Sequence, residues 1–239
     1  MIVCTSISPT HTNKDIQEQC IKSWIDLGLE VYSFNCKAEC LTLKEQYPYV
    51  NFIETYRTME YTYGKPLVSI NAVLDWCKDQ EENNFCLINS DIEIKSDKET
   101  IDRVKEQMKT SIVLANRNDY DSDKNVLKPP YLLGIDIFFI HKKWMSFYPQ
   151  SMHCFGMTFW DYYIPFVALR SGIEVQFVSQ NIALHKAHAA QYSNDNWLKS
   201  GRYFLWEQGL YQFDDTRGVG QMSTYVYNFI YNASKRTQI

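Results

Sequence analysis

A short polar segment, Asn89-Ser90-Asp91, directly follows the apolar run from Phe85 to Ile88. The run is typical of a buried strand, and residues two apart in a strand share a face, so Asn89 and Asp91 are predicted to point the same way. A carboxylate at such a strand end suits a divalent cation, which in turn suits a diphosphate. An Asx turn that simply ends the strand explains the same three residues about equally well.

Two histidines, His185 and His188, stand three residues apart in the later segment from Ala183 to His188. Imidazole is a common ligand of transition metals, so the pair is a candidate metal site. A surface loop with one packed histidine is the more frequent origin of such a pair, and the spacing alone favours that interpretation.

The carboxylate of Asp161 follows Trp160 in an aromatic segment. A carboxylate among aromatic residues can have a shifted pKa and act as a base. Residues 158–161 also fit a capping box, in which Asp161 reaches back to the start of a helix. The two roles are compatible.

Three cations, Arg57, Lys65 and Arg117, lie nearest the predicted strand ends, where each could neutralise a phosphate. Most such residues are only solvated. The sequence has no G-x-G-x-x-G and no G-x-x-x-x-G-K-[ST] motif, so dinucleotide binding and Walker-type phosphate binding lose support.

Strand and helix patterns alternate through most of the chain. The apolar runs predict strands over 2–5, 31–34, 52–55, 85–88, 112–115, 135–140, 175–178 and 182–184. Apolar residues at helical spacing predict helices over 16–27, 39–46, 66–77, 101–108 and 159–169. After Gln191 the sequence is aromatic and polar and predicts a helical or irregular extension.

This alternation predicts an α/β fold with a mixed sheet flanked by helices. We expect one domain over residues 1–192, with residues 193–239 packed on it as an extension. Ligands of such sheets bind beyond the carboxyl ends of the strands. The loops after Thr5, Ile88 and Ala115 are therefore expected to carry the site.

The composition of the 239 residues is that of a folded protein, with 45% hydrophobic and 22% charged residues. A net charge of −4 disfavours general binding of nucleic acids. The longest apolar stretch, Leu132 to Ile140, contains Asp136 and is too short to span a membrane. Seven scattered cysteines are typical of reduced thiols, which favours a cytoplasmic location.

The order and spacing of these segments resemble the GT-A-type glycosyltransferases, which move a sugar from a nucleotide-sugar donor. The resemblance runs from Met1 to about Tyr192. Asn89-Ser90-Asp91 resembles the D-x-D metal segment of that fold, and residues 155–161 resemble the (I/F)G-x-x-x-W-D segment of a subgroup of small predicted glycosyltransferases. Residues 185–192 resemble a closing H-x-x-H-x-Y pattern, with one extra residue before the tyrosine.

The resemblance implies a Rossmann-type GT-A sheet and a site that holds Mn²⁺ or Mg²⁺ through Asp91 with His185 or His188. We therefore expect Asp91 within about 10 Å of one of these histidines, the reach of two bonds to one cation. Asp161 is implied to be the catalytic base if the enzyme inverts, and to stabilise the cationic sugar if it retains. The implied donor-binding residues are Thr5, Ser6, Ser8, Arg57, Lys65, Asn89, Ser90 and Arg117.

The implied partners are a UDP- or GDP-sugar donor and a glycan or other hydroxyl acceptor, with residues 193–239 as a wall or lid on the acceptor side. One departure concerns the first D-x-D aspartate, which is Asn89 here. An amide adds no charge, so the affinity for metal would depend more heavily on Asp91.

Two other functions remain open at the level of sequence. A sugar nucleotidyltransferase has a similar sheet but usually a glycine-rich basic loop after the first strand, where this chain has Thr5-Ser6-Ile7-Ser8-Pro9. A non-catalytic carbohydrate-binding protein on the same scaffold is compatible with Asn89 and with the aromatic C-terminal segment.

Overall fold

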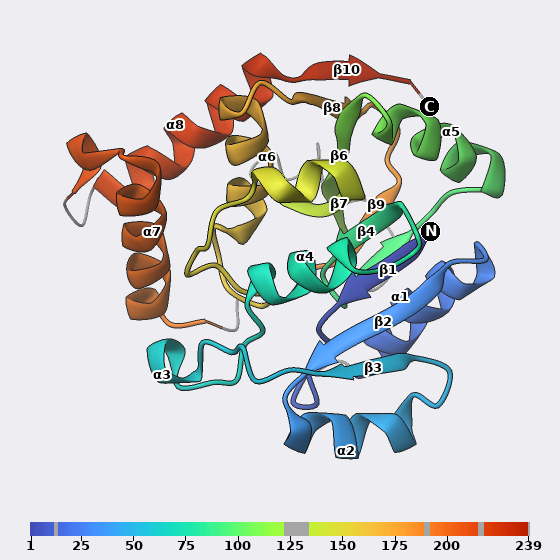
Figure 1. Ribbon diagram of the computed structural model, residues 1–239. Helices are drawn as coiled ribbons and strands as arrows, with labels where there is room; N and C mark the ends of the chain where they lie inside the picture. The colour runs from blue at the N-terminus through green and yellow to red at the C-terminus, as the bar shows by residue number, and fades with distance from the viewer. Residues whose placement is uncertain (12–13, 122–133, 189–191, 215–217, 239) are drawn as a thin grey trace.

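The computed structural model describes residues 1–11, 14–121, 134–188, 192–214 and 218–238, and its main feature is a mixed sheet with helices on both faces (Figure 1). The main sheet runs in the order β10 (Lys235–Thr237), β8 (Glu174–Val178), β6 (Ser111–Tyr120), β7 (Ile135–His141), β4 (Asn84–Ile88), β1 (Ile2–Thr5), β2 (Glu30–Asn35) and β3 (Asn51–Glu54). Strand β7 is antiparallel to both of its neighbours, and the other adjacent pairs are parallel. The predicted mixed α/β sheet is confirmed.

Two short strands, β5 (Ile92–Ile94) and β9 (Ala183–Lys186), lie beside the far end of β6. The register of β6 shifts between Ala115 and Asn116, which marks a bulge or irregularity. Before this point β6 pairs with β8, and from Arg117 onward it pairs with β9. The irregularity therefore separates the part of β6 that builds the main sheet from the part that meets β9.

Side chains alternate across the sheet and build two cores. Val3, Cys86 and Ile88 pack against one set of helices, α1 (Lys14–Asp26), α2 (Lys37–Gln46) and α5 (Lys98–Met108). Cys4 and Leu87 pack on the other face, whose helices are α4 (Ile70–Lys78), α6 (Trp160–Arg170), α7 (Asn194–Gln208) and α8 (Gly218–Ala233). The alternation follows from the two-residue period of a strand. Short helical turns complete the described chain: α3 (Glu60–Tyr63), η1 (Lys142–Phe147) and η2 (Tyr211–Phe213).

The predicted strands are all present, but one helix start was wrong. The helix predicted from Pro66 begins only at Ile70, with Ser69 as the residue before it. The intervening residues are extended because Val68 bridges to Thr58 and Ser69 bridges to Cys154.

The C-terminal segment is more regular than the sequence indicates. It forms α7 and α8, which lie beside α6 in Figure 1, and then β10, which adds an edge to the sheet next to β8. None of the helices in the described ranges has the length and apolarity needed to cross a bilayer. All seven cysteines lie in those ranges and are free thiols.

Helices α7 and α8 approach each other at Gly201, where a Cβ atom would lie 2.4 Å from Cγ1 of Val219. We expect Gly201→Ala to destabilise the protein, because overpacking costs about 1–3 kcal/mol while the gain in helix propensity is at most about 1 kcal/mol. The free energy of unfolding in denaturant measures the effect.

Gly220→Ala is the matched control, since a Cβ atom at Gly220 would meet nothing closer than Trp197 at 3.9 Å. Equal stability of the two variants would contradict the close approach of α7 and α8.

Candidate functional site

Polar residues from four segments converge at one edge of the sheet. Strands β1 and β4 are parallel neighbours, so Thr5 and Ile88 end at the same edge. Strand β6 runs in the direction of β4, because β7 between them is antiparallel to both. Its carboxyl half therefore extends from this edge and carries Arg117 and Asp119 to β9.

Asp91 is the centre of a cluster of three histidines. Its Oδ2 atom lies 3.2 Å from Nε2 of His188, 3.6 Å from Nε2 of His185 and 3.7 Å from Nε2 of His11. The Nε2 atoms of His185 and His188 are 3.2 Å apart. The structure thus brings the two histidines of the sequence pattern to Asp91, well within the expected 10 Å, and adds His11 from the loop after β1. We call these four residues the Asp91 cluster.

Strand pairing explains how residues so distant in sequence meet. Strand β9 lies between β5 and β6, with His185 opposite Ile92 on one side and Asp119 on the other. Asp91 immediately precedes Ile92, so the backbone register fixes its position next to His185. Nδ1 of His185 lies 2.8 Å from Oδ1 of Asp119.

A chain of polar contacts continues from Asp119 back to Asn89. Nε of Arg117 lies 3.1 Å from Oδ1 of Asp119, and its Nη1 lies 3.3 Å from Oδ2 of Asp136. Nδ2 of Asn89 donates to Oδ1 of Asp136 over 2.7 Å. Arg117 therefore contacts two carboxyl groups at once and connects Asp119, which supports His185, with Asp136, which holds Asn89.

The histidines determine the charge of the cluster. Burial alone would raise the pKa of Asp91, but hydrogen bonds from His11, His185 and His188 lower it well below its usual value. Burial lowers the pKa of His185, yet the hydrogen bonds with Asp119 and Asp91 outweigh burial and raise it to about 9. A cation that binds His185 must therefore displace a proton.

The pKa of Asp161 is shifted in the opposite direction to that of Asp91. Its side chain is partly buried, and burial followed by the neighbouring Asp136 raises its pKa to about 8. The backbone N–H groups of Asp161 and Tyr162, together with Arg117, act in the other direction without cancelling the shift. A carboxyl group that titrates near neutral pH can accept a proton in a reaction.

The start of α6 differs from the predicted capping box. The residue before the helix is Phe159, whose φ of 71° lies in the left-handed region, and no side chain caps the helix. The Thr158 hydroxyl is buried and has no hydrogen-bond partner among the described residues. The capping box was therefore wrong, and the aromatic contacts of Phe159 with Trp197 and Phe204 hold this strained residue instead.

The Asn89-Ser90-Asp91 segment is a turn rather than the end of a strand. The backbone N–H of Ile92 donates to the carbonyl of Asn89 over 3.2 Å. Asn89 contacts Asp136, and Asp91 contacts the histidines.

Some of the predicted donor-binding residues lie at the strand ends near Asp91, and others lie apart from the Asp91 cluster. Thr5 is fully buried at the end of β1, and its hydroxyl has no partner among the described residues. Ser6 and Ser8 follow in the same loop, partly exposed. The Ser90 hydroxyl contacts the side-chain amide of Gln17 on α1 at 2.8 Å.

The other two cations do not join the cluster. Arg57 pairs with Asp75 at 2.5 Å and contacts Gln150 at 3.0 Å, and Lys65 is exposed after α3. Of the three cations from the sequence, only Arg117 is among the residues that the structure connects to Asp91. The donor-binding role of Arg57 and Lys65 stays a prediction.

Three residues of the site escaped the sequence analysis: His11, Asp119 and Asp136. His11 lies in the loop after β1, and Asp119 lies near the carboxyl end of β6, beyond the predicted strand 112–115. That position was a usable signal, since ligand-binding residues collect there. Asp136 lay inside an apolar strand pattern, and its buried charge was the only sign of a partner.

The chemistry of the Asp91 cluster fits a divalent cation. Donor atoms of His11, Asp91 and His188 all lie within 4.8 Å of one another. Imidazole nitrogens and a carboxylate oxygen are common ligands of divalent transition metals.

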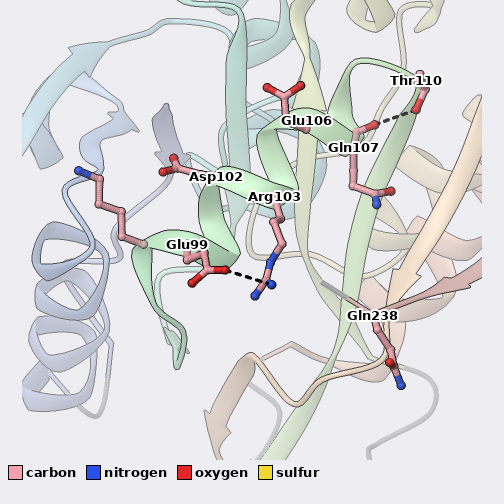
Figure 2. Close-up of a pocket in the computed structure, with 8 residues that line it drawn as sticks. Glu99, Asp102, Arg103, Glu106, Gln107, Thr110 and Gln238 are labelled. Atoms are coloured by element: carbon pink, nitrogen blue, oxygen red, sulfur yellow. Dashed lines mark hydrogen bonds and ion pairs between the residues drawn. The ribbon is translucent and has the colours of Figure 1, made fainter.

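A separate hollow of about 850 Å³ lies along α5 (Figure 2). It is lined by Lys98, Glu99, Asp102, Arg103, Glu106, Gln107, Thr110 and Gln238. Several of its charged residues already form ion pairs along the helix, such as Arg103 with Glu99. None of its lining residues belongs to the Asp91 cluster, so the hollow is not the candidate site.

Comparisons with known proteins add little to this geometry. No family model and no curated protein matches the chain. A protein from Desulfovibrio desulfuricans G20, described provisionally as a nucleotide-diphospho-sugar transferase, aligns over 96% of this chain and 97% of its own, with 6% identity and a TM-score of 0.49. HddC from Yersinia pseudotuberculosis, solved with GMP-PN, aligns over 62% of this chain and 80% of its own, with 14% identity and a TM-score of 0.39. At such values these similarities assign neither a family nor an activity to this chain.

Replacing Asp161 tests its shifted pKa. The pKa of about 8 in the folded state lies above the ordinary aspartate pKa of 3.8, so the folded state holds the proton more tightly than the unfolded state. The stability that protonated Asp161 contributes is then fully present below about pH 4 and is lost as the pH rises through about 8. Asp161→Asn should match the wild-type melting temperature near pH 4 and exceed it near pH 8.

The control is Asp79→Asn, which changes an exposed aspartate at the end of α4. Thermal melts of this variant should differ from wild type by a similar small amount across the same pH range. A pH-independent effect of Asp161→Asn would contradict the raised pKa.

Proposed function

We propose that this protein is a metal-dependent glycosyltransferase that moves a sugar from a nucleoside-diphosphate sugar to an acceptor hydroxyl. One observation supports this proposal most directly. The Asp91 cluster, which suits a cation, and Asp161, which titrates near neutral pH, are linked electrostatically through Asp136 and Arg117. Transfer from such a donor needs charge neutralisation at the diphosphate and a carboxylate near the sugar.

The residues around Asp91 would hold the donor's leaving group. A divalent cation bound there supplies positive charge against the diphosphate. Asn89 and Arg117 contact Asp136 and so keep the turn that carries Asp91 in place. The loop from Thr5 to Ser8 at the neighbouring strand end would receive the base and ribose, with the unpartnered Thr5 hydroxyl as one contact.

Asp161 would act on the acceptor side. In an inverting reaction it accepts the proton of the attacking hydroxyl, and its pKa of about 8 suits that exchange near neutral pH. In a retaining reaction the same carboxylate stabilises the positively charged sugar.

The C-terminal helices would form the wall of the acceptor side. Nδ2 of Asn116, next to Arg117 on β6, lies 3.2 Å from the hydroxyl of Tyr227 on α8. Helix α8 also packs on α6, which carries Asp161. Residues of α8 are thus near both parts of the proposed site.

Donor binding can be measured by thermal melts with a panel of UDP- and GDP-sugars, with and without Mn²⁺. The correct donor at a hundredfold excess over its Kd should stabilise the protein by about 2.7 kcal/mol. Asp91→Asn should remove this stabilisation, because it takes away the negative charge at the centre of the cluster. Asp102→Asn, on the exposed face of α5, should retain it.

An absence of stabilisation by every nucleotide sugar would contradict the proposal. Release of pyrophosphate from a nucleoside triphosphate and a sugar phosphate would instead identify a sugar nucleotidyltransferase. Sugar binding that is indifferent to EDTA, without donor hydrolysis, would identify a non-catalytic carbohydrate-binding protein.

Catalysis by Asp161 is tested separately from binding. Asp161→Asn should lower kcat for donor hydrolysis or transfer by about 10²–10⁴-fold, the usual contribution of a positioned base. The same variant should still be stabilised by donor and cation, because Asp161 is not part of the Asp91 cluster. Unchanged kcat would remove Asp161 from the reaction.

A further inference from the structure

We propose that His11, His185, His188 and Asp91 form a resident transition-metal site that binds Zn²⁺ or Co²⁺ without any nucleotide and discriminates against Mg²⁺. The inference rests on the metal-dependent part of the proposed function, because it concerns the same residues. It says nothing of the reaction that the protein carries out.

The donor atoms have the composition of a transition-metal site. Three of the four side chains offer an imidazole nitrogen and only Asp91 offers a carboxylate. Imidazole suits Zn²⁺ and the late first-row metals, whereas Mg²⁺ prefers oxygen ligands and keeps several waters. Mn²⁺ comes lowest among the divalent first-row metals in intrinsic affinity. The expected order of affinity is therefore Zn²⁺ and Co²⁺, then Mn²⁺, then Mg²⁺.

The spacing of the donor atoms agrees with a single shared cation. Bonds of about 2.1 Å place neighbouring ligand atoms about 3.4 Å apart in a tetrahedral site and about 3.0 Å apart in an octahedral one. Around Oδ2 of Asp91 the observed separations are 3.2, 3.6 and 3.7 Å. The Nε2 atoms of His185 and His188 are also 3.2 Å apart. The ligand atoms of His11, Asp91 and His188 all lie within 4.8 Å of one another, so these three residues can share one ion, with Nε2 of His185 beside them.

The ligands are already oriented by their surroundings. Asp119 contacts Nδ1 of His185, which leaves Nε2 directed at the cluster, and Arg117 holds Asp119 in turn. A carboxylate behind a histidine in this way is a common support of metal-bound imidazole. His11 and His185 are 8% and 4% exposed, so two of the ligands are held in buried positions.

This orientation makes a nucleotide unnecessary for metal binding. A single carboxylate would need the oxygens of a diphosphate to complete the coordination of a cation. Here His11 from the loop after β1, His185 from β9 and His188 just after β9 offer three imidazoles in addition to the carboxylate of Asp91. The protein alone thus offers the three ligands that a catalytic zinc site contains, and a position stays open for a further ligand.

Isothermal titration of the chelator-treated full-length protein with each metal alone tests the inference. We expect one equivalent of Zn²⁺ or Co²⁺ to bind, Mn²⁺ to bind more weakly, and Mg²⁺ to give no comparable heat. The visible absorption of bound Co²⁺ gives a second readout that does not depend on activity. His11→Gln should weaken Zn²⁺ and Co²⁺ binding by at least about tenfold, as loss of a metal-site contact does.

His141→Gln is the matched control, because His141 ends β7 and its Nδ1 accepts from the backbone of Lys143 instead of facing the cluster. This variant should bind metal as the wild type does, and circular dichroism checks that both variants are folded. Binding of Mg²⁺ as tight as that of Zn²⁺, or an unchanged affinity in His11→Gln, would overturn the inference.

The outcome is distinguishable from failure of the transferase proposal. Metal binding without any effect of nucleotide sugars would keep the resident site and remove the glycosyltransferase. Binding of metal only when a nucleoside diphosphate is present would keep the transferase and remove the resident site. Binding of pyrophosphate that EDTA leaves unchanged, with no metal bound, would show that the histidines hold an anion directly and would overturn the inference.

Discussion

The pairing of β9 between β5 and β6 is the constraint on which the candidate site depends. It sets His185 opposite both Ile92 and Asp119, and so fixes the distance from His185 to Asp91 through the backbone. Helix α1 secures the outer strand, since Nε1 of Trp24 donates to the carbonyl of Ile92 over 2.9 Å. A shift of one residue in the register would turn His185 to the other face of the strand and disperse the cluster.

The pKa values of the four aspartates in the site are shifted in opposite directions because their surroundings differ. Burial alone would raise the pKa of Asp91 and Asp119, but hydrogen bonds from the histidines lower that of Asp91, and contacts with His185 and Arg117 lower that of Asp119. Asp136 and Asp161 are instead dominated by burial, which raises the pKa of both. Arg117 lies between the two groups and pairs with a member of each. The site therefore separates an end where two ionised aspartates meet the histidines and Arg117 from an end that can exchange a proton near neutral pH.

The packing of the C-terminal helices α7 and α8 supports the start of α6, which carries Asp161. Phe159 directly precedes α6 in a left-handed conformation, and the rings of Trp197 and Phe204 on α7 pack against it. Helix α7 can come this close because Gly201 leaves no side chain between it and Val219 of α8. The geometry that positions Asp161 at the start of α6 thus relies on a part of the chain for which the sequence pattern predicted no definite element.

The sequence by itself determined the strands and the kinds of residue available for chemistry. Apolar runs such as Phe85 to Ile88 are local signals, because a buried strand needs apolar side chains on its own residues. The start of α6 at Phe159 and the roles of His11, Asp119 and Asp136 were not determined in this way. Each depends on a partner that is distant in the chain, such as His185 for Asp119 or Arg117 for Asp136. Only the tertiary structure decides these contacts, because hydrogen bonds and ion pairs form between side chains that strand register and helix packing bring together, and no local pattern encodes which ones will meet.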